Sequence, residues 1–300
     1  MKTALLVNTS GLGDIVSSLI VGNALLAEYR VSYLIPASFR GLFTDTPFGE
    51  FVDDSLPESD FDLVIDLVSN KKSRKIIRCL SSSAKIGRAK NRLQRLKLFR
   101  TYTASVPKHS PAGHIVWDYL PILNKLQLQA NKRIYLETPY KGNGSGISVH
   151  VGAQRKIRRI PLELVIKLSK YCETRGIPLR LIGNEAYEVA QALRATNGYA
   201  YHEYGSLKDL KHWLVDSKAV IASDSGVFHL SSALRVPTLG LYGPNTYARS
   251  GSINACAEYV ELDYECRPCN QNAECPFNNR CMTEIPFSAI ESFLVRTTES

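Results

Sequence analysis

The chain has 300 residues, of which 44% are hydrophobic and 22% are charged, and its formal net charge is +9 at pH 7. This composition is that of a soluble globular protein with room for two ordinary domains, and no apolar run reaches the roughly 18–20 residues that span a bilayer. The N-terminus is too short for a signal peptide, and the seven cysteines are an odd number. We therefore expect a cytoplasmic protein without a disulfide scaffold.

The first half of the chain alternates apolar runs with helical patterns, which predicts a Rossmann-like domain over residues 1–140. Thr3–Val7 has the composition of a buried strand, and a glycine-rich loop and a helix over Ile15–Tyr29 follow it. The loop is not G-x-G-x-x-G, so it does not indicate a dinucleotide site. Its glycines present Asp14, either as a helix N-cap or as a general base. Further elements are expected as strands at 31–36, 62–67 and 85–87, a helix at 117–126 and an extended segment at 134–136.

Residues 71–100 contain six Lys and six Arg and no acidic residue. Such a run is either the solvated face of a helix or a surface for an anionic partner. The candidate partners are a phosphorylated glycolipid, the membrane surface and RNA. Arg88, Arg92 and Arg95 are the predicted contacts.

A second α/β pattern follows residues 139–146, PYKGNGSG, which we interpret as a linker. It predicts a second Rossmann-like domain over residues 147–285. The expected elements are strands at 147–150 and 179–182 and helices at 161–175 and 187–196. A last helix, Phe287–Val295 within residues 286–300, is expected to pack back across both domains.

The run from Ala219 to Pro244 predicts a strand, a polar turn, a helix over Val227–Leu234 and a second strand. In a parallel βαβ unit the helix N-terminus lies at the carboxyl edge of the sheet, where its free N–H groups and dipole favour a phosphate. Gly226 allows close approach of a ligand, and Asp224 suits a sugar hydroxyl. The alternative is an ordinary capped turn without ligand chemistry.

Four cysteines near the C-terminus have the spacing C-x2-C-x5-C-x5-C. They are Cys266, Cys269, Cys275 and Cys281. This pattern is compatible with a tetrahedral site for zinc, or for iron with four thiolates. Reduced thiols that pack a loop are the alternative.

The run S-D-S-G-x-x-H-L-x-x-A-L-x-x-P-T-L-x-L-Y-G-P, residues 223–244, resembles the signature of glycosyltransferase family 9, the heptosyltransferases. The resemblance extends to LLVNTSGLGDIV at residues 5–16, FDLVIDL with Ser73, His150–Pro161, L-I-G with Glu188, and the cysteine-rich stretch. It implies a GT-B fold, with two Rossmann-like domains facing across a cleft. It also implies inverting transfer of a heptose from ADP-L-glycero-D-manno-heptose to a lipopolysaccharide core acceptor.

The resemblance implies functional roles for those residues of this chain that match the family's motifs. The implied roles are a base for Asp14, diphosphate contacts for Ser225, Gly226 and His229, a sugar contact for Asp224, and a ribose contact for Glu188. Arg158 stands where the family usually has a phosphate-binding lysine before Trp-Pro, and Lys156 is the alternative if the loop slips by two residues. Because arginine and helix N–H groups would take the charge, no cofactor is expected for transfer.

The expected partners are an ADP-sugar donor, a phosphorylated glycolipid or protein acceptor, and the inner membrane surface, which the protein contacts peripherally. Nucleic acid is not expected. Two alternatives stay open: a protein heptosyltransferase that modifies autotransporters, whose relatives bind iron through four cysteines, and a non-catalytic module that binds RNA or membrane through its basic run.

Overall fold

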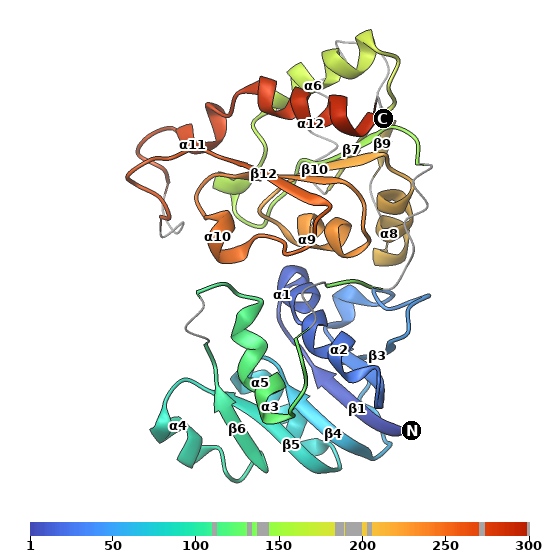
Figure 1. The fold of residues 1–300 in the computed structure, drawn as a ribbon, viewed down its shortest axis with the longest axis vertical. Coiled ribbons are helices and arrows are strands. Elements are labelled where there is room, and N and C mark those ends of the chain that lie inside the picture. Colours follow the sequence, from blue (N-terminus) through green and yellow to red (C-terminus); the bar gives the residue numbers. More distant parts are fainter. Residues whose placement is uncertain are drawn as a thin grey trace. The chain divides into compact units, whose positions relative to one another are not determined.

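The computed structural model describes residues 1–109, 113–130, 134–136, 144–183, 189, 200–202, 206–269 and 274–298. The chain divides into two compact units (Figure 1). The first comprises Met1–Thr138 and Ser206–Lys208, and the second comprises Pro139–Gly205 and Asp209–Ser300. Among the described residues, no helix is both long and apolar enough to cross a membrane.

The first unit contains a parallel sheet whose six described strands lie in the order β3-β2-β1-β4-β5-β6. The strands are β1 (Lys2–Val7), β2 (Tyr29–Ile35), β3 (Gly49–Val52), β4 (Phe61–Asp66), β5 (Ser82–Ala89) and β6 (Ala104–Pro107). The order reverses between β1 and β4. In doubly wound sheets ligands bind at this reversal, beyond the carboxyl ends of the strands.

The second unit repeats this topology with the order β12-β11-β10-β7-β8-β9. Its strands are β7 (Ile147–His150), β8 (Leu179–Ile182), β9 (Ala200–His202), β10 (Ala219–Ser223), β11 (Thr238–Tyr242) and β12 (Ala257–Glu261). The reversal lies between β7 and β10, both of which are buried along their whole length. The expected α/β fold with two parallel sheets is confirmed.

Helices cover the two sheets. They are α1 (Leu12–Ser17), α2 (Leu19–Leu25), α3 (Lys71–Cys79), α4 (Arg92–Lys97), α5 (Leu120–Lys125), α6 (Leu162–Thr174), α8 (Leu207–Val215), α9 (Gly226–Ala233), α10 (Tyr247–Ser250), α11 (Arg280–Thr283) and α12 (Phe287–Thr298). Short 3-10 turns lie at Ala37–Phe39, Trp117–Tyr119 and Lys156–Arg158.

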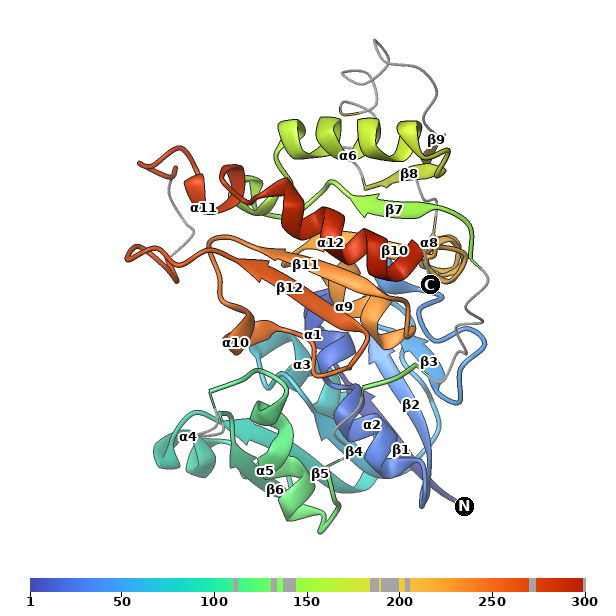
Figure 2. The same ribbon diagram turned by 45° about the horizontal axis from the view of Figure 1, so that its top comes forward.

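The C-terminal helix α12 packs beside α6 on the second sheet, as Figure 2 shows. Its buried side chains Ile290, Phe293 and Leu294 join the core of that unit. The structure therefore assigns the helix to the second unit, and its packing across both domains stays a prediction.

The helix expected over Ile15–Tyr29 is two helices, because Ser18 interrupts it between α1 and α2. The Ser18 hydroxyl donates to the carbonyl of Ile15 and accepts from the side-chain amide of Asn8. Side-chain bonds of this kind compete with the helical ladder. Residues 134–136, expected to be extended, form no strand within the described part of the chain.

A buried carboxylate holds the turn that follows β4. Asp66 is fully buried and accepts from the hydroxyls of Tyr102 (2.6 Å) and Ser73 (2.8 Å) and from the backbone N–H groups of Ser69 (2.6 Å) and Val68 (3.0 Å). Burial raises the pKa of Asp66, and these hydrogen bonds oppose the rise. The carboxylate thus fixes the carboxyl end of β4.

Removing this carboxylate should destabilise the first unit. Asp66→Ala leaves four donors without their acceptor, so we expect it to lower the free energy of unfolding by about 3 kcal/mol, and Tyr102→Phe by about 1 kcal/mol. Urea unfolding followed by circular dichroism measures both values. Asp60→Ala, at an exposed carboxylate, is the control. An Asp66→Ala protein as stable as this control would contradict the account.

Candidate functional site

Asp14 lies in the first turn of α1, directly after the loop that leaves β1. The N-cap of this helix is Gly11 and not Asp14, so the N-cap alternative for Asp14 is wrong. The backbone carbonyl of Asp14 accepts from Asn8 Nδ2 (3.2 Å) and from the Tyr119 hydroxyl (3.4 Å). These two bonds fix the loop and the first turn. Asp14 keeps a solvent-exposed surface, although protein atoms surround much of its carboxyl group.

Desolvation raises the pKa of Asp14 above its ordinary value, and the positive charges of Arg88 and Lys108 oppose the rise. A carboxylate with a raised pKa takes up a proton more readily than an ordinary one, which suits a general base. The two cations keep the ionised form accessible.

The structure corrects the prediction for Arg88. Its side chain is buried and donates to the carbonyls of Leu67 (2.5 Å), Asp118 (3.0 Å) and Lys108, and its guanidinium carbon lies 4.7 Å from the ring centroid of Tyr119. A guanidinium bound in this way is part of the frame around Asp14 and not a solvent-facing contact for an anionic partner.

The basic run as a whole is not one surface, because α3, β5 and α4 share it. In α3, Lys72 forms an ion pair with Asp53 (2.5 Å) and Arg74 donates to the carbonyl of Ser69 (3.1 Å). Arg92 and Arg95 are exposed on α4, so a contact to an anionic acceptor stays a prediction for these two residues.

In the second unit, Ser225 is the N-cap of α9 at the carboxyl end of β10. The Ser225 side chain makes no capping hydrogen bond to α9; its hydroxyl lies instead 3.3 Å from Nδ1 of His150. The first turn begins at Gly226, and His229 is buried one turn later. An uncapped helix N-terminus presents N–H groups and a positive dipole end, which favour an anionic group.

His150 ends β7 next to this turn and is buried. Burial lowers the pKa of His150 from 6.5 to about 4. The imidazole is therefore neutral near pH 7 and adds no charge at the α9 N-terminus.

The structure brings together Arg158 and Asp224, two residues to which sequence analysis gives separate roles. Arg158 Nη1 lies 3.1 Å from Asp224 Oδ2, and the Asp224 side chain is only 7% exposed. Lys156 begins the same 3-10 turn and is exposed. Glu188, the expected ribose contact, lies outside the described residues.

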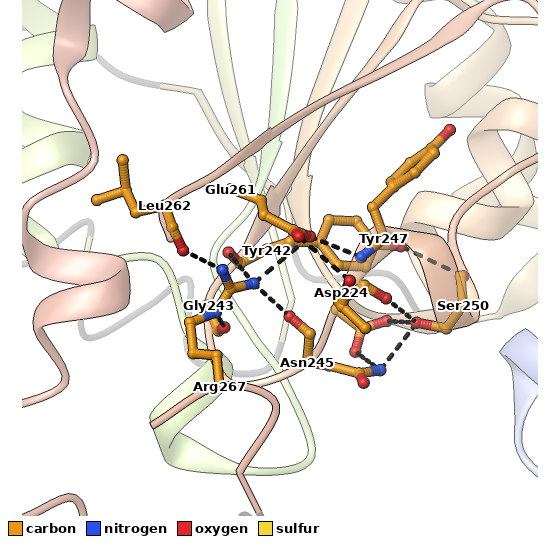
Figure 3. A network of polar contacts seen from close by, with 10 residues as sticks. Asp224, Tyr242, Gly243, Asn245, Tyr247, Ser250, Glu261, Leu262 and Arg267 are labelled. Atoms are coloured by element: carbon orange, nitrogen blue, oxygen red, sulfur yellow. Dashed lines mark hydrogen bonds and ion pairs between the residues drawn. The ribbon is translucent and has the colours of Figure 1, made fainter. Parts of the chain in front are cut away.

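Two further residues around Asp224 were missed by sequence analysis (Figure 3). Asn245 Nδ2 donates to Asp224 Oδ2 (3.0 Å) and to the Ser250 hydroxyl (2.8 Å), and that hydroxyl donates to Asp224 Oδ1 (3.4 Å). Both residues follow β11, the strand next to β10. The sequence signal that could have indicated Asn245 is its position as a polar residue directly after Gly243-Pro244.

Arg267 fixes the loop that carries Asn245, as Figure 3 also shows. Its guanidinium donates to the carbonyls of Asn245 (2.6 Å), Tyr242 (3.3 Å) and Gly243, and it forms an ion pair with Glu261 (3.4 Å). A single buried cation thus joins β11, β12 and the segment that contains Cys266 and Cys269.

Known proteins match both the sequence and the fold. The model of the family described as glycosyltransferase family 9 (heptosyltransferase) matches residues 52–279. The chain belongs to glycosyltransferase family 9. Lipopolysaccharide heptosyltransferase 1 of Pseudomonas aeruginosa is 34% identical over 103 residues, which are 33% of this chain and span 29% of that relative's length.

Two solved structures show that this family 9 member has the GT-B fold. The E. coli heptosyltransferase WaaC, solved with ADP, has a TM-score of 0.76 at 17% identity, and the match covers 99% of this chain and 100% of that one. The iron-containing dodecameric glycosyltransferase TibC of enterotoxigenic E. coli H10407 has a TM-score of 0.61 at 11% identity, with coverage of 99% and 76%.

A metal site at the four cysteines of this family 9 protein stays a prediction. Among the described residues, no cluster of three or more His, Cys, Asp or Glu side chains has an arrangement that could hold a metal ion. Burial raises the pKa of Cys281, the charge of Arg267 opposes the rise, and Cys275, Cys266 and Cys269 add to it. The Cys281 thiol donates to Asn279 Oδ1 (3.7 Å).

The neutral state of His150 makes stability depend on pH. Above pH 6.5 the histidine is neutral in both states, but as the pH falls from 6.5 toward 4 only the unfolded chain gains its proton, so stability is lost over this window. The loss due to His150 is up to about 3 kcal/mol. Chemical unfolding at several pH values should give a flatter dependence for His150→Gln. Equal slopes for both proteins would contradict the burial of a neutral imidazole.

Proposed function

We propose that the protein is an inverting heptosyltransferase that moves a heptose from ADP-L-glycero-D-manno-heptose to a lipopolysaccharide core acceptor. The observation that carries this proposal is the uncapped α9 N-terminus beside the ion pair of Arg158 and Asp224, in a member of family 9. Solved structures of WaaC with ADP and with ADP-2-deoxy-2-fluoro heptose support the donor class. The named activity of the P. aeruginosa relative supports the acceptor class.

The second unit holds the donor in this proposal. Ser225, Gly226 and His229 receive the diphosphate at the start of α9, where N–H groups and the helix dipole act on it. Arg158 has five N–H donors, so one guanidinium can contact both Asp224 and a phosphate oxygen. Asp224, held by Asn245, accepts hydrogen bonds from the sugar hydroxyls.

The first unit supplies the base. Asp14 takes the proton of the acceptor hydroxyl while this oxygen attacks the anomeric carbon, and the bond from that carbon to the diphosphate breaks. Direct displacement inverts the configuration of the anomeric carbon. The leaving diphosphate is neutralised by Arg158 or Lys156 and by the α9 N–H groups, so transfer needs no cofactor.

The acceptor determines where the protein works. Arg92 and Arg95 are exposed cations that suit a phosphorylated glycolipid, which would place the protein in the cytoplasm at the inner membrane surface. A protein acceptor is the second candidate. The four-cysteine spacing, which the resemblance links to iron-binding protein heptosyltransferases, is the observation that favours it.

Removing the base should abolish turnover and spare donor binding. We expect Asp14→Asn to lower kcat by about 10²–10⁴-fold, because it removes proton transfer in the transition state. Calorimetric titration of ADP should give an unchanged Kd, and Glu28→Gln, at an exposed carboxylate, is the control. Near wild-type kcat in Asp14→Asn would remove Asp14 from the mechanism.

The donor class can be tested by thermal shift. ADP-sugars should raise the Tm more than UDP- or GDP-sugars, and Arg158→Met should diminish that increase by removing a phosphate contact. EDTA should leave turnover unchanged. A preference for UDP-sugars, or a strict requirement for Mn²⁺, is the result that would refute the donor assignment.

Elemental analysis tests the predicted four-cysteine metal site. If the four thiolates hold a tetrahedral site, elemental analysis of protein purified without chelators should find about one zinc or iron per chain. The Cys275→Ser protein should then lose it. Metal-free protein would contradict the metal site and favour four reduced thiols that pack the loop.

A further inference from the structure

Three highly exposed apolar side chains of the described chain gather on α4 and the turn after it. Leu93 and Phe99 are each 71% exposed and Leu96 is 70% exposed. Of the other large apolar residues that the structure describes as exposed, only Met1 exceeds these values. Single exposed apolar residues are ordinary, whereas three within one short segment mark an interaction surface.

This segment is fixed to the fold and keeps its apolar residues turned outward. Leu98 is buried in the core of the first unit, and Asn91 caps α4 by accepting from the N–H of Gln94 (2.8 Å). Arg95 donates to the carbonyl of Ser105 on β6 (2.8 Å). Leu93, Leu96 and Phe99 follow at intervals of three, which in a helical turn lie on neighbouring positions of one side.

Exposed cations lie beside and between these three residues in the chain. They are Lys90, Arg92, Arg95, Lys97 and Arg100. No acidic residue occurs anywhere between Lys71 and Arg100. The partner of this surface must therefore offer negative charge together with an apolar layer beneath it.

We propose that Leu93, Leu96 and Phe99 with their surrounding cations form a docking surface for an anionic phospholipid bilayer. Apolar side chains enter the boundary between headgroups and acyl chains, while lysines and arginines contact the headgroup phosphates. RNA fits less well, because two of the three side chains are leucines and bases stack on aromatic rings. The inference deepens the proposed function, whose acceptor is a membrane glycolipid, by naming the surface that meets the membrane.

Vesicle co-sedimentation tests the proposal directly. Wild-type protein should bind vesicles of phosphatidylcholine and phosphatidylglycerol much more strongly than vesicles of phosphatidylcholine alone. The triple variant L93S/L96S/F99S should bind about tenfold more weakly or worse, because it removes the apolar insertion. The variant K90Q/K97Q should lose most of the dependence on phosphatidylglycerol and on salt.

Two controls separate this inference from folding and from the proposed function. L162S/V295S changes exposed apolar residues elsewhere and should bind vesicles as the wild type does. Because Leu93, Leu96 and Phe99 are exposed, the triple variant should keep the wild-type Tm and the same turnover on a deacylated, water-soluble acceptor. Vesicle binding without any heptose transfer would support the surface and refute the proposed function.

Three results would overturn the inference. The first is that wild-type protein does not bind vesicles that contain phosphatidylglycerol. The second is that the triple variant binds them as strongly as the wild type does. The third is that wild-type protein binds an RNA homopolymer more strongly than the vesicles.

Discussion

Strand β10 is hydrogen-bonded to β7 on one side and to β11 on the other, so its carboxyl end cannot shift without breaking the centre of the second sheet. Asp224 and Ser225 follow this end directly, and α9 begins one residue later. The direction of α9 and the position of its uncapped N–H groups are therefore set by backbone pairing. Backbone pairing positions the corresponding loop of the first sheet in the same way. There β1 lies between β2 and β4 and leads into the loop before Asp14.

The buried charge of Asp224 explains much of the remaining architecture of the second unit. A carboxylate in that position is costly unless it is paired and hydrogen-bonded. Arg158 supplies the pairing charge, and Asn245 and Ser250 supply the hydrogen bonds. Arg267 in turn holds the backbone of Asn245. The contacts run from residue 158 to residue 267, so segments far apart in the chain depend on one carboxylate.

Sequence reasoning was most successful where local composition determines structure. Central parallel strands are buried on both faces and are therefore apolar runs, which made β1, β4, β7, β10 and β11 predictable. The four edge strands β3, β6, β9 and β12 carry no such run and were missed. The turn of Asp224 to Gly226 was recognised because capping residues and a glycine stand next to each other in the chain.

Long-range pairing was not predictable. The sequence places Arg88 in a run of exposed-looking cations, but Arg88 lies on β5 and its guanidinium is bound by carbonyls from three other segments. The ion pair of Arg158 and Asp224 joins residues that are 66 positions apart, so no local motif could have predicted it. Asn245 and Arg267 became visible as site residues only through their contacts.

A crystal structure of the protein with ADP would test the central claim most directly. We expect diphosphate oxygens to accept hydrogen bonds from the backbone N–H groups at the start of α9, with Arg158 in contact with both a phosphate and Asp224. A diphosphate bound away from the α9 N-terminus, or an Arg158 side chain that touches no phosphate oxygen, would contradict the account.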